Sequence, residues 1–313
     1  VHRSYKFCLL TLHGSVRNPE DETEMVFFAL QVEDIRTPEK NFTLSTKDFL
    51  NLNPNTLTCP TFRFQKDAEI NKSIYRKIPV LLNESSDVKN FYKPKVWRLL
   101  NTTDDSSNFV KLEDGYIKEG IIPVIEAKMI HQFDHRFSIY ESDKNSEVKT
   151  RETSIIEKEN PDFLSTARHY IKDFFFRKRI AEEYCDKGWF FTARNIARST
   201  DERTVISAIL PKVASCEMTP YIEVGAGIES ATFLCGVLNS FVLDYAARQK
   251  VGGTHLSYFI LYQLPVVAPA EFDVFLIDFF ANRVLELTYT SWDLQPFAQD
   301  CGYEGPPFIW DED

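Results

Sequence analysis

The chain has 313 residues, of which 43% are hydrophobic and 14% aromatic, and it carries a net charge of −10. This length and composition suffice for one large folded domain or two ordinary ones. No apolar run reaches about 18 residues and no charged and apolar leader opens the chain, so the sequence predicts neither a membrane span nor a signal peptide. The six cysteines form no C-x-x-C pair, which argues against a zinc site and favours reduced thiols in a cytoplasmic protein.

The negative charge is concentrated at one end of the chain. Residues 271–313 contain ten acidic residues and one basic residue, a net of −9, which leaves −1 for the other residues. Residues 168–203 contain nine basic and six acidic residues, so this stretch is locally positive. Because a nucleic acid responds to the local surface more than to the average charge, the composition does not exclude DNA as a partner.

The first part of the chain, residues 1–141, is expected to form short strands and short helices. Its first apolar run lies close to Val1, which is typical of a segment of a longer protein. Apolar runs bounded by polar residues favour strands, whereas Ser45 belongs to a residue type that caps helices. The elements expected here are strands over 5–12 and 25–32, a short helix after Ser45, a helix over 66–76 and strand-like structure over 121–140.

Residues 142–161 are rich in charged residues and poor in large apolar ones. Such a composition favours a solvated loop, because few of these side chains gain from burial. We therefore expect a linker here, which divides the chain into an N-terminal part, residues 1–141, and a C-terminal part, residues 162–313.

The C-terminal part is expected to combine short strands with long helices. Its clearest amphipathic helix covers 231–250, where aromatic or aliphatic residues recur every fourth position. The elements expected here are a helix over 173–187, a strand after Gly188, an arginine-bearing loop, strands over 204–210 and 221–227, the helix over 231–250, a strand over 256–267 and a helix over 271–292. The predicted fold class is therefore mixed α+β, with short strands and long late helices.

The sequence lacks the motifs of common catalytic and metal sites. It contains no phosphate-binding P-loop and no G-x-S-x-G nucleophile turn. Gly225 and Gly227 lack the third glycine of a dinucleotide motif, and we interpret them as a tight turn. His131 and His135 are four residues apart but lack the glutamate of zinc proteases, so we interpret them as a polar turn. We therefore expect no catalytic residue and no metal in this chain.

Two polar segments are candidates for DNA contact. Arginine suits both phosphate oxygens and the guanine edge in the major groove, and short hydroxyl or imidazole groups can add hydrogen bonds. The alternatives are ion pairs within the fold for the arginine loop, and a helix C-terminus that attracts cations for the glycine elbow. The candidates are Arg194, Arg198 and Arg203 in the loop, and Arg248, Lys250, Thr254 and His255 around Gly252 and Gly253 in the elbow.

Other basic residues form weaker candidates for DNA contact. For those in the helix expected over 173–187, a solvated helix face is the competing interpretation. These weaker candidates are Lys128, His135, Arg136, Arg177 and Arg179.

The candidate segments also carry a family resemblance. "WFFTARNIARSTDERTVISAILP" and "FLCGVLNSFVLDYAARQKVGGTHLSYFILYQLPV" resemble the C-terminal half of large adenine-N6 DNA methyltransferases of restriction and phage-defence systems, of the type IIG-like and BREX-like groups. The resemblance covers nearly the whole chain in collinear order. It extends to "YKFCLLTL", "LNPNTLTCPTFRFQKDAEINKSIYRKIPVL", "KMIHQFDHRFSIY" and "RVLELTYTSWDLQPFAQDCGYEGPPFIWDED".

The resemblance implies a target-recognition region that grips duplex DNA and reads its site. In such enzymes the methyl-donor domain and its N-P-P-Y/F loop lie upstream, whereas "NPDF" at Asn160 lacks the second proline. We therefore expect S-adenosylmethionine to be the cofactor of the parent enzyme and not of this chain. The expected partners are double-stranded DNA and the catalytic domain of the same polypeptide, with no membrane. The alternative is an interaction module that docks the catalytic half or another subunit without reading DNA, and that exposes an apolar patch.

Overall fold

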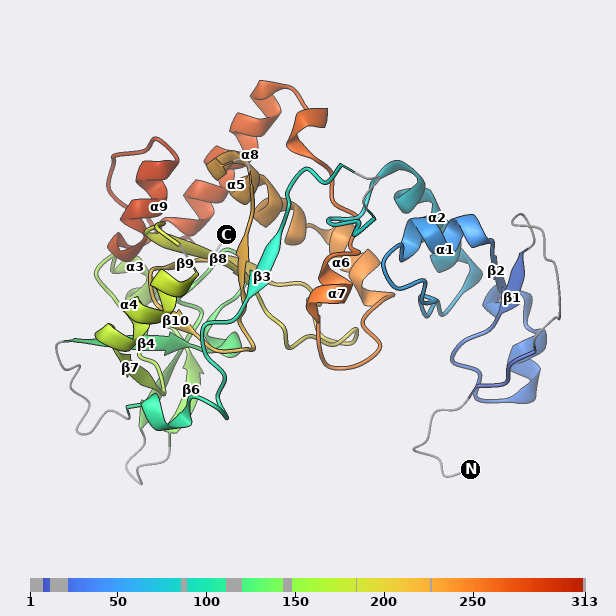
Figure 1. Ribbon diagram of the computed structural model, residues 1–313, viewed down its shortest axis with the longest axis horizontal. Coiled ribbons are helices and arrows are strands. Elements are labelled where there is room, and N and C mark those ends of the chain that lie inside the picture. Colours follow the sequence, from blue (N-terminus) through green and yellow to red (C-terminus); the bar gives the residue numbers. More distant parts are fainter. Residues whose placement is uncertain are drawn as a thin grey trace.

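The computed structural model describes residues 8–11, 22–85, 89–110, 120–142, 148–183, 185–225 and 227–311. Helices and small β-sheets alternate along these ranges, which confirms the predicted mixed α+β class. Of the strand expected over 5–12, the described residues 8–11 do not form a strand, and the rest lies outside the described residues. The molecule is elongated (Figure 1). A small N-terminal unit, which contains the elements from Thr23 to Lys77, lies at one end, and the later elements form the larger body at the other.

A four-stranded antiparallel sheet forms the centre of the body, in the order β3-β11-β8-β9. Every residue of β8 and β9 is buried, because the sheet separates two hydrophobic cores. Phe191 and Ile209 face one core, whereas Phe190 and Leu210 face the other, as the two-residue repeat of a strand requires. The strands are β3 (Lys95–Trp97), β8 (Trp189–Ala193), β9 (Ser207–Pro211) and β11 (Tyr221–Glu223).

Helices α5 and α8 belong to the first of these cores (Figure 1). The single helix expected over 231–250 is wrong, because α5 and α6 meet at a bend of 63°. The strand expected over 256–267 is also wrong, since α7 is a short helix within that run. The helices of this region are α5 (Gly227–Leu238), α6 (Phe241–Arg248), α7 (Tyr258–Leu261), α8 (Val274–Thr288) and α9 (Gln295–Asp300).

Side chains at the bend explain why the helix breaks. Asn239 accepts a hydrogen bond from the backbone N–H of Ser207 (3.0 Å) and donates one to its carbonyl (2.9 Å), which fixes the bend to β9. Ser240 then caps α6 by accepting from the backbone N–H of Leu243. Within the described ranges, no single helix is long and apolar enough to cross a membrane. The bent pair α5 and α6 together has the length and the composition of a membrane span, and no other feature of one is shown.

The second core lies between the central sheet and a three-stranded sheet of order β10-β4-β7. Helix α4 follows β7 directly and ends before the predicted residue 187. Its apolar side chains Phe176 and Ile180 complete this core. The elements are β4 (Ile121–Ile125), β7 (Tyr170–Lys172), α4 (Asp173–Glu182) and β10 (Ala214–Ser215).

The described residues of the predicted linker over 142–161 are largely regular structure. Strand β6 (Val148–Glu152) pairs with β5 (Ser138–Ser142), and helix α3 (Ile155–Glu159) follows. The charged residues of this stretch bind one another: Arg151 is 2.8 Å from Glu141 and 2.7 Å from Glu157. The loop interpretation is therefore wrong for residues 148–159, although most of these residues are exposed as their composition predicts, because charge here serves pairing across the hairpin as well as solvation.

The N-terminal unit has its own small core, to which Ala246 of α6 contributes. The predicted cap is confirmed, since Ser45 accepts a hydrogen bond from the backbone N–H of Asp48 (3.2 Å). The strand expected over 25–32 is wrong beyond Met25, where the chain leaves the sheet. The elements are β1 (Thr23–Met25), β2 (Phe42–Leu44), α1 (Thr46–Leu52) and α2 (Gln65–Lys77).

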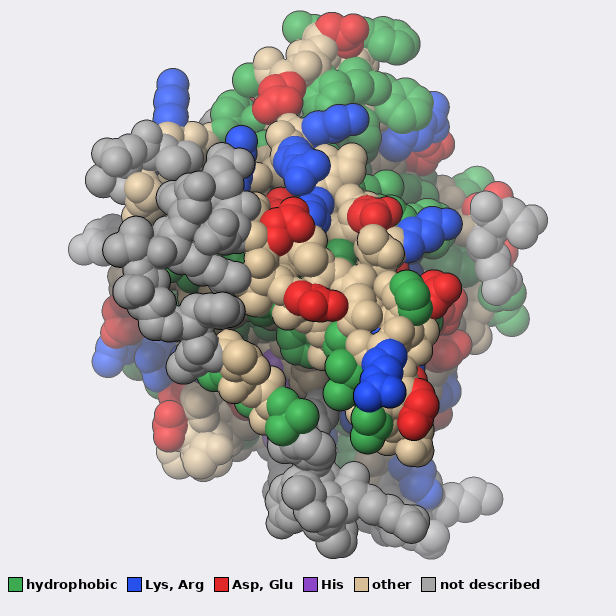
Figure 2. Space-filling model, turned by 90° about the vertical axis from the view of Figure 1, so that its right-hand side faces the viewer, with side chains coloured by type: hydrophobic (Ala, Val, Ile, Leu, Met, Phe, Trp, Pro, Cys, Tyr) green, Lys and Arg blue, Asp and Glu red, His purple; other side chains and the backbone are tan. Residues whose placement is uncertain are grey.

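Short 3-10 helices join these elements. They are η1 (Val32–Arg36), η2 (Pro38–Lys40), η3 (Ser106–Asn108), η4 (Ala127–Met129), η5 (Pro269–Glu271) and η6 (Trp292–Leu294). On the face seen from the N-terminal end, basic and acidic side chains are intermingled, and hydrophobic side chains gather at the top of the view, over the region of α8 (Figure 2).

Candidate nucleic-acid interface

The two segments singled out in the sequence lie against each other. The arginine loop, residues 194–206, joins β8 to β9, and the glycine elbow, residues 249–257, joins α6 to α7. Ile196 and His255 form an antiparallel bridge. The Ala197 N–H donates to the carbonyl of Thr254 (3.1 Å), and the Leu256 N–H donates to the carbonyl of Asn195 (2.6 Å). The structure thus joins the two segments into one loop pair, which lies below α6 and α7 in Figure 1.

Three of the candidate residues are exposed on the loop pair: Arg198, Thr254 and His255. The backbone N–H of Arg198 donates to Asp201 (3.1 Å), which shapes the tip of the arginine loop. Within the described residues, the Arg198 guanidinium forms no hydrogen bond or ion pair. Arg198 is therefore the arginine of this loop that is available to an external anion.

The other two arginines of the loop point inward. Arg203 donates to the carbonyl of Asn239, and its Nε lies 3.9 Å from the Asp244 carboxylate. Arg194 donates to the carbonyl of Ile130, and burial lowers the pKa of Arg194 to about 10. Arg203 therefore lies beside an acidic residue within the fold, as the ion-pair alternative expects, whereas Arg194 is held by a backbone carbonyl.

Arg248 fixes the arginine loop to α6. It lies 2.8 Å from Asp244, one helical turn earlier, and donates to the carbonyls of Ser199 (3.0 Å) and Glu202. Asp244 also accepts the backbone N–H groups of Thr204 (2.7 Å) and Val205. Asp244 thus holds the arginine loop in place and was not among the predicted site residues, although its spacing of four from Arg248 is typical of a helical ion pair.

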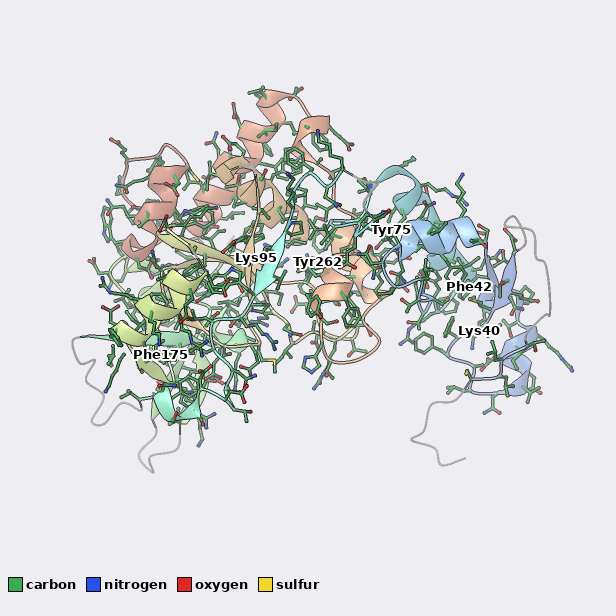
Figure 3. All side chains as sticks on the ribbon, viewed as in Figure 1. Lys40, Phe42, Tyr75, Lys95, Phe175 and Tyr262 are labelled. Carbon is green, nitrogen blue, oxygen red and sulfur yellow. The ribbon has the colours of Figure 1, made fainter. Side chains whose placement is uncertain are left out.

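Lys250 does not project from the surface, contrary to the prediction. Its ammonium group donates to the carbonyls of Leu52 and Gln263 and lies 4.3 Å from the centre of the Tyr75 ring. Burial lowers the pKa of Lys250 well below its usual value. Tyr75, labelled on α2 in Figure 3, donates to the same Gln263 carbonyl (3.0 Å). Lys250 therefore joins the N-terminal unit to the body and is closed to a phosphate.

The two glycines of the elbow do not approach another part of the chain. A Cβ atom built on Gly252 or Gly253 would meet nothing within 4 Å, and neither residue has a positive φ. Neither close packing nor backbone conformation within the described residues therefore requires glycine at these positions. What glycine does provide here is bare, exposed backbone on the loop pair.

Among the weaker candidates, His135 is a structural residue. Only 4% of it is exposed, and its Nε2 lies 3.1 Å from Asp293 and 3.3 Å from the Ser291 hydroxyl. This arrangement differs from a nucleophile with its base and orienting carboxylate, because the serine and the aspartate contact the same ring nitrogen of His135. Burial raises the pKa of Asp293, but its contacts with His135, Ser291 and Arg136 outweigh this and leave it below the usual value.

Arg136 is also closed to DNA, because only 1% of it is exposed. Its guanidinium donates to backbone carbonyls of Lys158 (2.8 Å), Asn160 (3.0 Å) and Thr290 (3.0 Å). Lys128, by contrast, is exposed and lies 5.5 Å from the centre of the Tyr140 ring. Of these two candidates, Arg136 is therefore buried and Lys128 is exposed.

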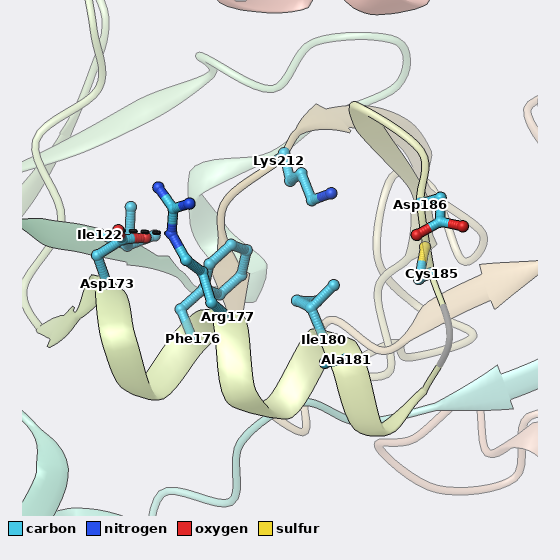
Figure 4. Close-up of a pocket in the computed structure, with 9 residues that line it drawn as sticks. All are labelled: Ile122, Asp173, Phe176, Arg177, Ile180, Ala181, Cys185, Asp186 and Lys212. Atoms are coloured by element: carbon cyan, nitrogen blue, oxygen red, sulfur yellow. Dashed lines mark hydrogen bonds and ion pairs between the residues drawn. The ribbon is translucent and has the colours of Figure 1, made fainter.

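Arg177 and Arg179 lie on α4, away from the loop pair. Arg179 binds Asp105 (2.7 Å), whereas Arg177 binds Asp173 (2.7 Å) beside a groove of about 580 Å³ (Figure 4). Lys212 borders the same groove. The two acidic residues of the lining, Asp173 and Asp186, balance the charges of Arg177 and Lys212. The groove lining is Ile122, Asp173, Phe176, Arg177, Ile180, Ala181, Cys185, Asp186 and Lys212. Such a mixed surface has no preference for an anion.

Two arrangements considered in the sequence, a cluster of metal ligands and a dinucleotide-type glycine loop, can be checked among the described residues. Within them, no group of three histidine, cysteine or acidic residues lies close enough to hold a metal ion. Gly225 and Gly227 lie between β11 and α5, but β11 runs antiparallel to both β3 and β8. A dinucleotide-type glycine loop requires a parallel βαβ unit. Gly225 and Gly227 therefore do not form a glycine loop of that type.

Comparisons with known proteins leave the family of this chain open. No protein-family model matches the sequence, and no curated protein gives a significant match. The function of the chain is therefore inferred from the resemblance of the quoted segments and from the geometry of the loop pair.

Proposed function

We propose that this chain is the DNA-recognition region of a site-specific adenine-N6 DNA methyltransferase, which acts on double-stranded DNA in the cytoplasm. The observation that carries the proposal is the loop pair, because the two segments with the family resemblance are far apart in sequence yet bridge each other at Ile196 and His255. Methyl transfer and S-adenosylmethionine binding belong, in this proposal, to the catalytic domain of the same polypeptide.

The loop pair offers the kinds of group that contact DNA. Arg198 supplies a guanidinium for a phosphate or a guanine edge, and Thr254 and His255 supply short hydrogen-bonding groups. The inner cations Arg203 and Arg248 hold the arginine loop in place through Asp244. A surface fixed in this way loses little conformational entropy when it binds.

Charge reversal at the tip of the loop pair tests the proposal. We expect Arg198→Glu combined with His255→Glu to weaken binding to a mixed-sequence duplex at least tenfold, because phosphate contacts dominate non-specific affinity. Fluorescence anisotropy between about 50 and about 200 mM salt should also give a shallower slope of log affinity against log salt, by about 0.9 for each phosphate that the variant no longer neutralises. Arg177→Glu is the matched control, since Arg177 is an exposed arginine on α4. Equal weakening by the control, or no weakening by the double change, contradicts the proposal.

The glycines give a second test that separates binding from folding. We expect Gly252→Ala with Gly253→Ala to leave the free energy of unfolding unchanged or to raise it by up to about 1 kcal/mol, because neither site is strained or packed. DNA binding should weaken, since the added methyl groups cover backbone that a duplex would approach. Thermal unfolding and anisotropy on the same sample measure both effects. Unchanged DNA affinity would remove the glycines from the interface.

A docking module is the second candidate function, and one observation favours it. The outer side of α8 exposes Val274 (72%), Phe275 (80%) and Phe279 (48%). An apolar surface of this kind is typical of a protein contact, here with the catalytic half or another subunit. A folded chain that binds no duplex at about 50 mM salt would favour this candidate over DNA recognition.

A further inference from the structure

Phe241 is a large apolar side chain placed in the open beside the arginine loop. It is the first residue of α6, and 84% of it is exposed. Its backbone lies at the 63° bend that Asn239 fixes to β9 and that Ser240 caps. An exposed phenylalanine is common on protein surfaces and needs no special explanation by itself. Phe241 differs from an ordinary exposed phenylalanine because its backbone is fixed at the bend and its ring lies against Arg203.

The support of the Phe241 ring is a buried cation. The Arg203 guanidinium lies 4.6 Å from the ring centre, and only 8% of the Arg203 side chain is exposed. Arg203 is itself held by the Asn239 carbonyl and lies near Asp244. One face of the ring therefore rests on a fixed guanidinium, while most of the ring stays open to solvent. Val242, the next residue, is 58% exposed and widens the apolar surface.

We propose that the Phe241 ring stacks on a DNA base at an opened base step of the duplex whose phosphates Arg198 contacts. This inference rests on the proposed function and adds a residue that acts on the bases. Apolar side chains insert between base steps in many DNA complexes, and aromatic rings stack on bases of any sequence. Such stacking uses the flat face of the base, so the Phe241 ring would accept any of the four bases whatever hydrogen-bonding groups its edge carries.

The loop pair that carries Arg203 favours a nucleic acid over an apolar protein surface as the partner of the Phe241 ring. Arg198, in the same loop as Arg203, is exposed and unpaired within the described residues, and His255 is exposed on the adjoining elbow. An apolar protein surface broad enough to cover both Phe241 and the loop pair would have to desolvate these groups without compensation, whereas a duplex offers them phosphates. Phe275 of α8 is similarly exposed, but the exposed acidic residues near it are Asp273, which caps α8, and Asp278 on the helix.

A duplex that already lacks one base tests the proposal without knowledge of the recognised site. Unstacking is part of the cost of insertion, and it is least where a base is missing or damaged. The full chain is expected to bind a duplex with one abasic position about tenfold more tightly than the intact duplex. Phe241→Ala should abolish this preference and weaken binding to the abasic duplex about 5-fold to 100-fold. Phe241→Trp should keep the preference, and Phe275→Ala should behave as the wild type.

The outcomes separate this inference from the proposed function. If the wild type binds both duplexes equally, or if Phe241→Ala keeps the preference, the stacking role is overturned while DNA recognition through Arg198 stands. If the wild type binds neither duplex at about 50 mM salt, both the proposed function and the stacking role are overturned. Circular dichroism of Phe241→Ala checks that the chain is folded.

Discussion

Replacing Arg136 with methionine is expected to lower the free energy of unfolding by about 4 kcal/mol, because buried backbone carbonyls would lose their donors. The guanidinium donates to the carbonyls of Lys158, Asn160 and Thr290, and only 1% of the residue is exposed. These carbonyls belong to α3, to the residue after α3 and to the segment after α8. One side chain thus holds together parts of the chain that are more than a hundred residues apart.

Urea unfolding followed by circular dichroism measures this effect as a shift of the midpoint at constant slope. Arg177→Met is the matched control, since Arg177 is 79% exposed and its ion pair lies within one helical turn. We expect the control to change the free energy of unfolding by less than about 0.5 kcal/mol. A decrease of less than about 1 kcal/mol for Arg136→Met would show that the carbonyls find other donors or water.

The elements that the sequence predicted well are those whose pattern is set locally. Helix α8 and the buried strands β8 and β9 follow from apolar periodicity and from short uninterrupted apolar runs. The bend between α5 and α6 could not be predicted in this way, because apolar residues continue through it. It depends on Asn239, which binds Ser207 from a strand more than thirty residues earlier.

The candidate site was predictable as a pair of segments but not as a set of side chains. Arg194, Arg198 and Arg203 are alike in sequence, and only the packed structure separates the exposed Arg198 from the two inner arginines. The same holds for Lys250, which follows a helix end in the sequence but lies under Tyr75 in the fold. Burial of a cation depends on which distant carbonyls and rings surround it, and residue spacing does not contain that information.

Most residues of 148–159 are exposed, as their composition predicts, but they form a strand and a helix where a loop was expected. Composition predicts solvation for charged residues because an unpaired buried charge is costly. Here Arg151 pairs with two glutamates, and Lys158 lies 2.7 Å from Asp134. The pairing allows a charged sequence to form a strand and a helix within the fold.

Replacing Lys250 with methionine is expected to change how stability depends on pH. The substitution keeps most of the side-chain volume but removes the ammonium group that contacts Leu52 and Gln263. Burial lowers the pKa of Lys250 in the folded chain. The ring of Tyr75 and the two carbonyls favour the charged form of Lys250, and they offset only part of this lowering of the pKa. In the unfolded chain a lysine has a pKa of about 10.4.

The sign of the effect follows from where the proton is bound. Between the folded and the unfolded pKa, the unfolded chain carries the lysine proton and the folded chain does not, so wild-type stability rises with pH. The difference in unfolding free energy between wild type and Lys250→Met should therefore increase with pH by up to about 1.4 kcal/mol per unit, and level off near pH 10.4. Burial also raises the pKa of Tyr75, but that residue is present in both proteins and its contribution largely cancels in the difference. Urea unfolding of both proteins at several values from pH 7 to pH 10 measures the slope. A difference that does not vary with pH would mean that Lys250 stays charged in its enclosure, held by the two carbonyls and the ring.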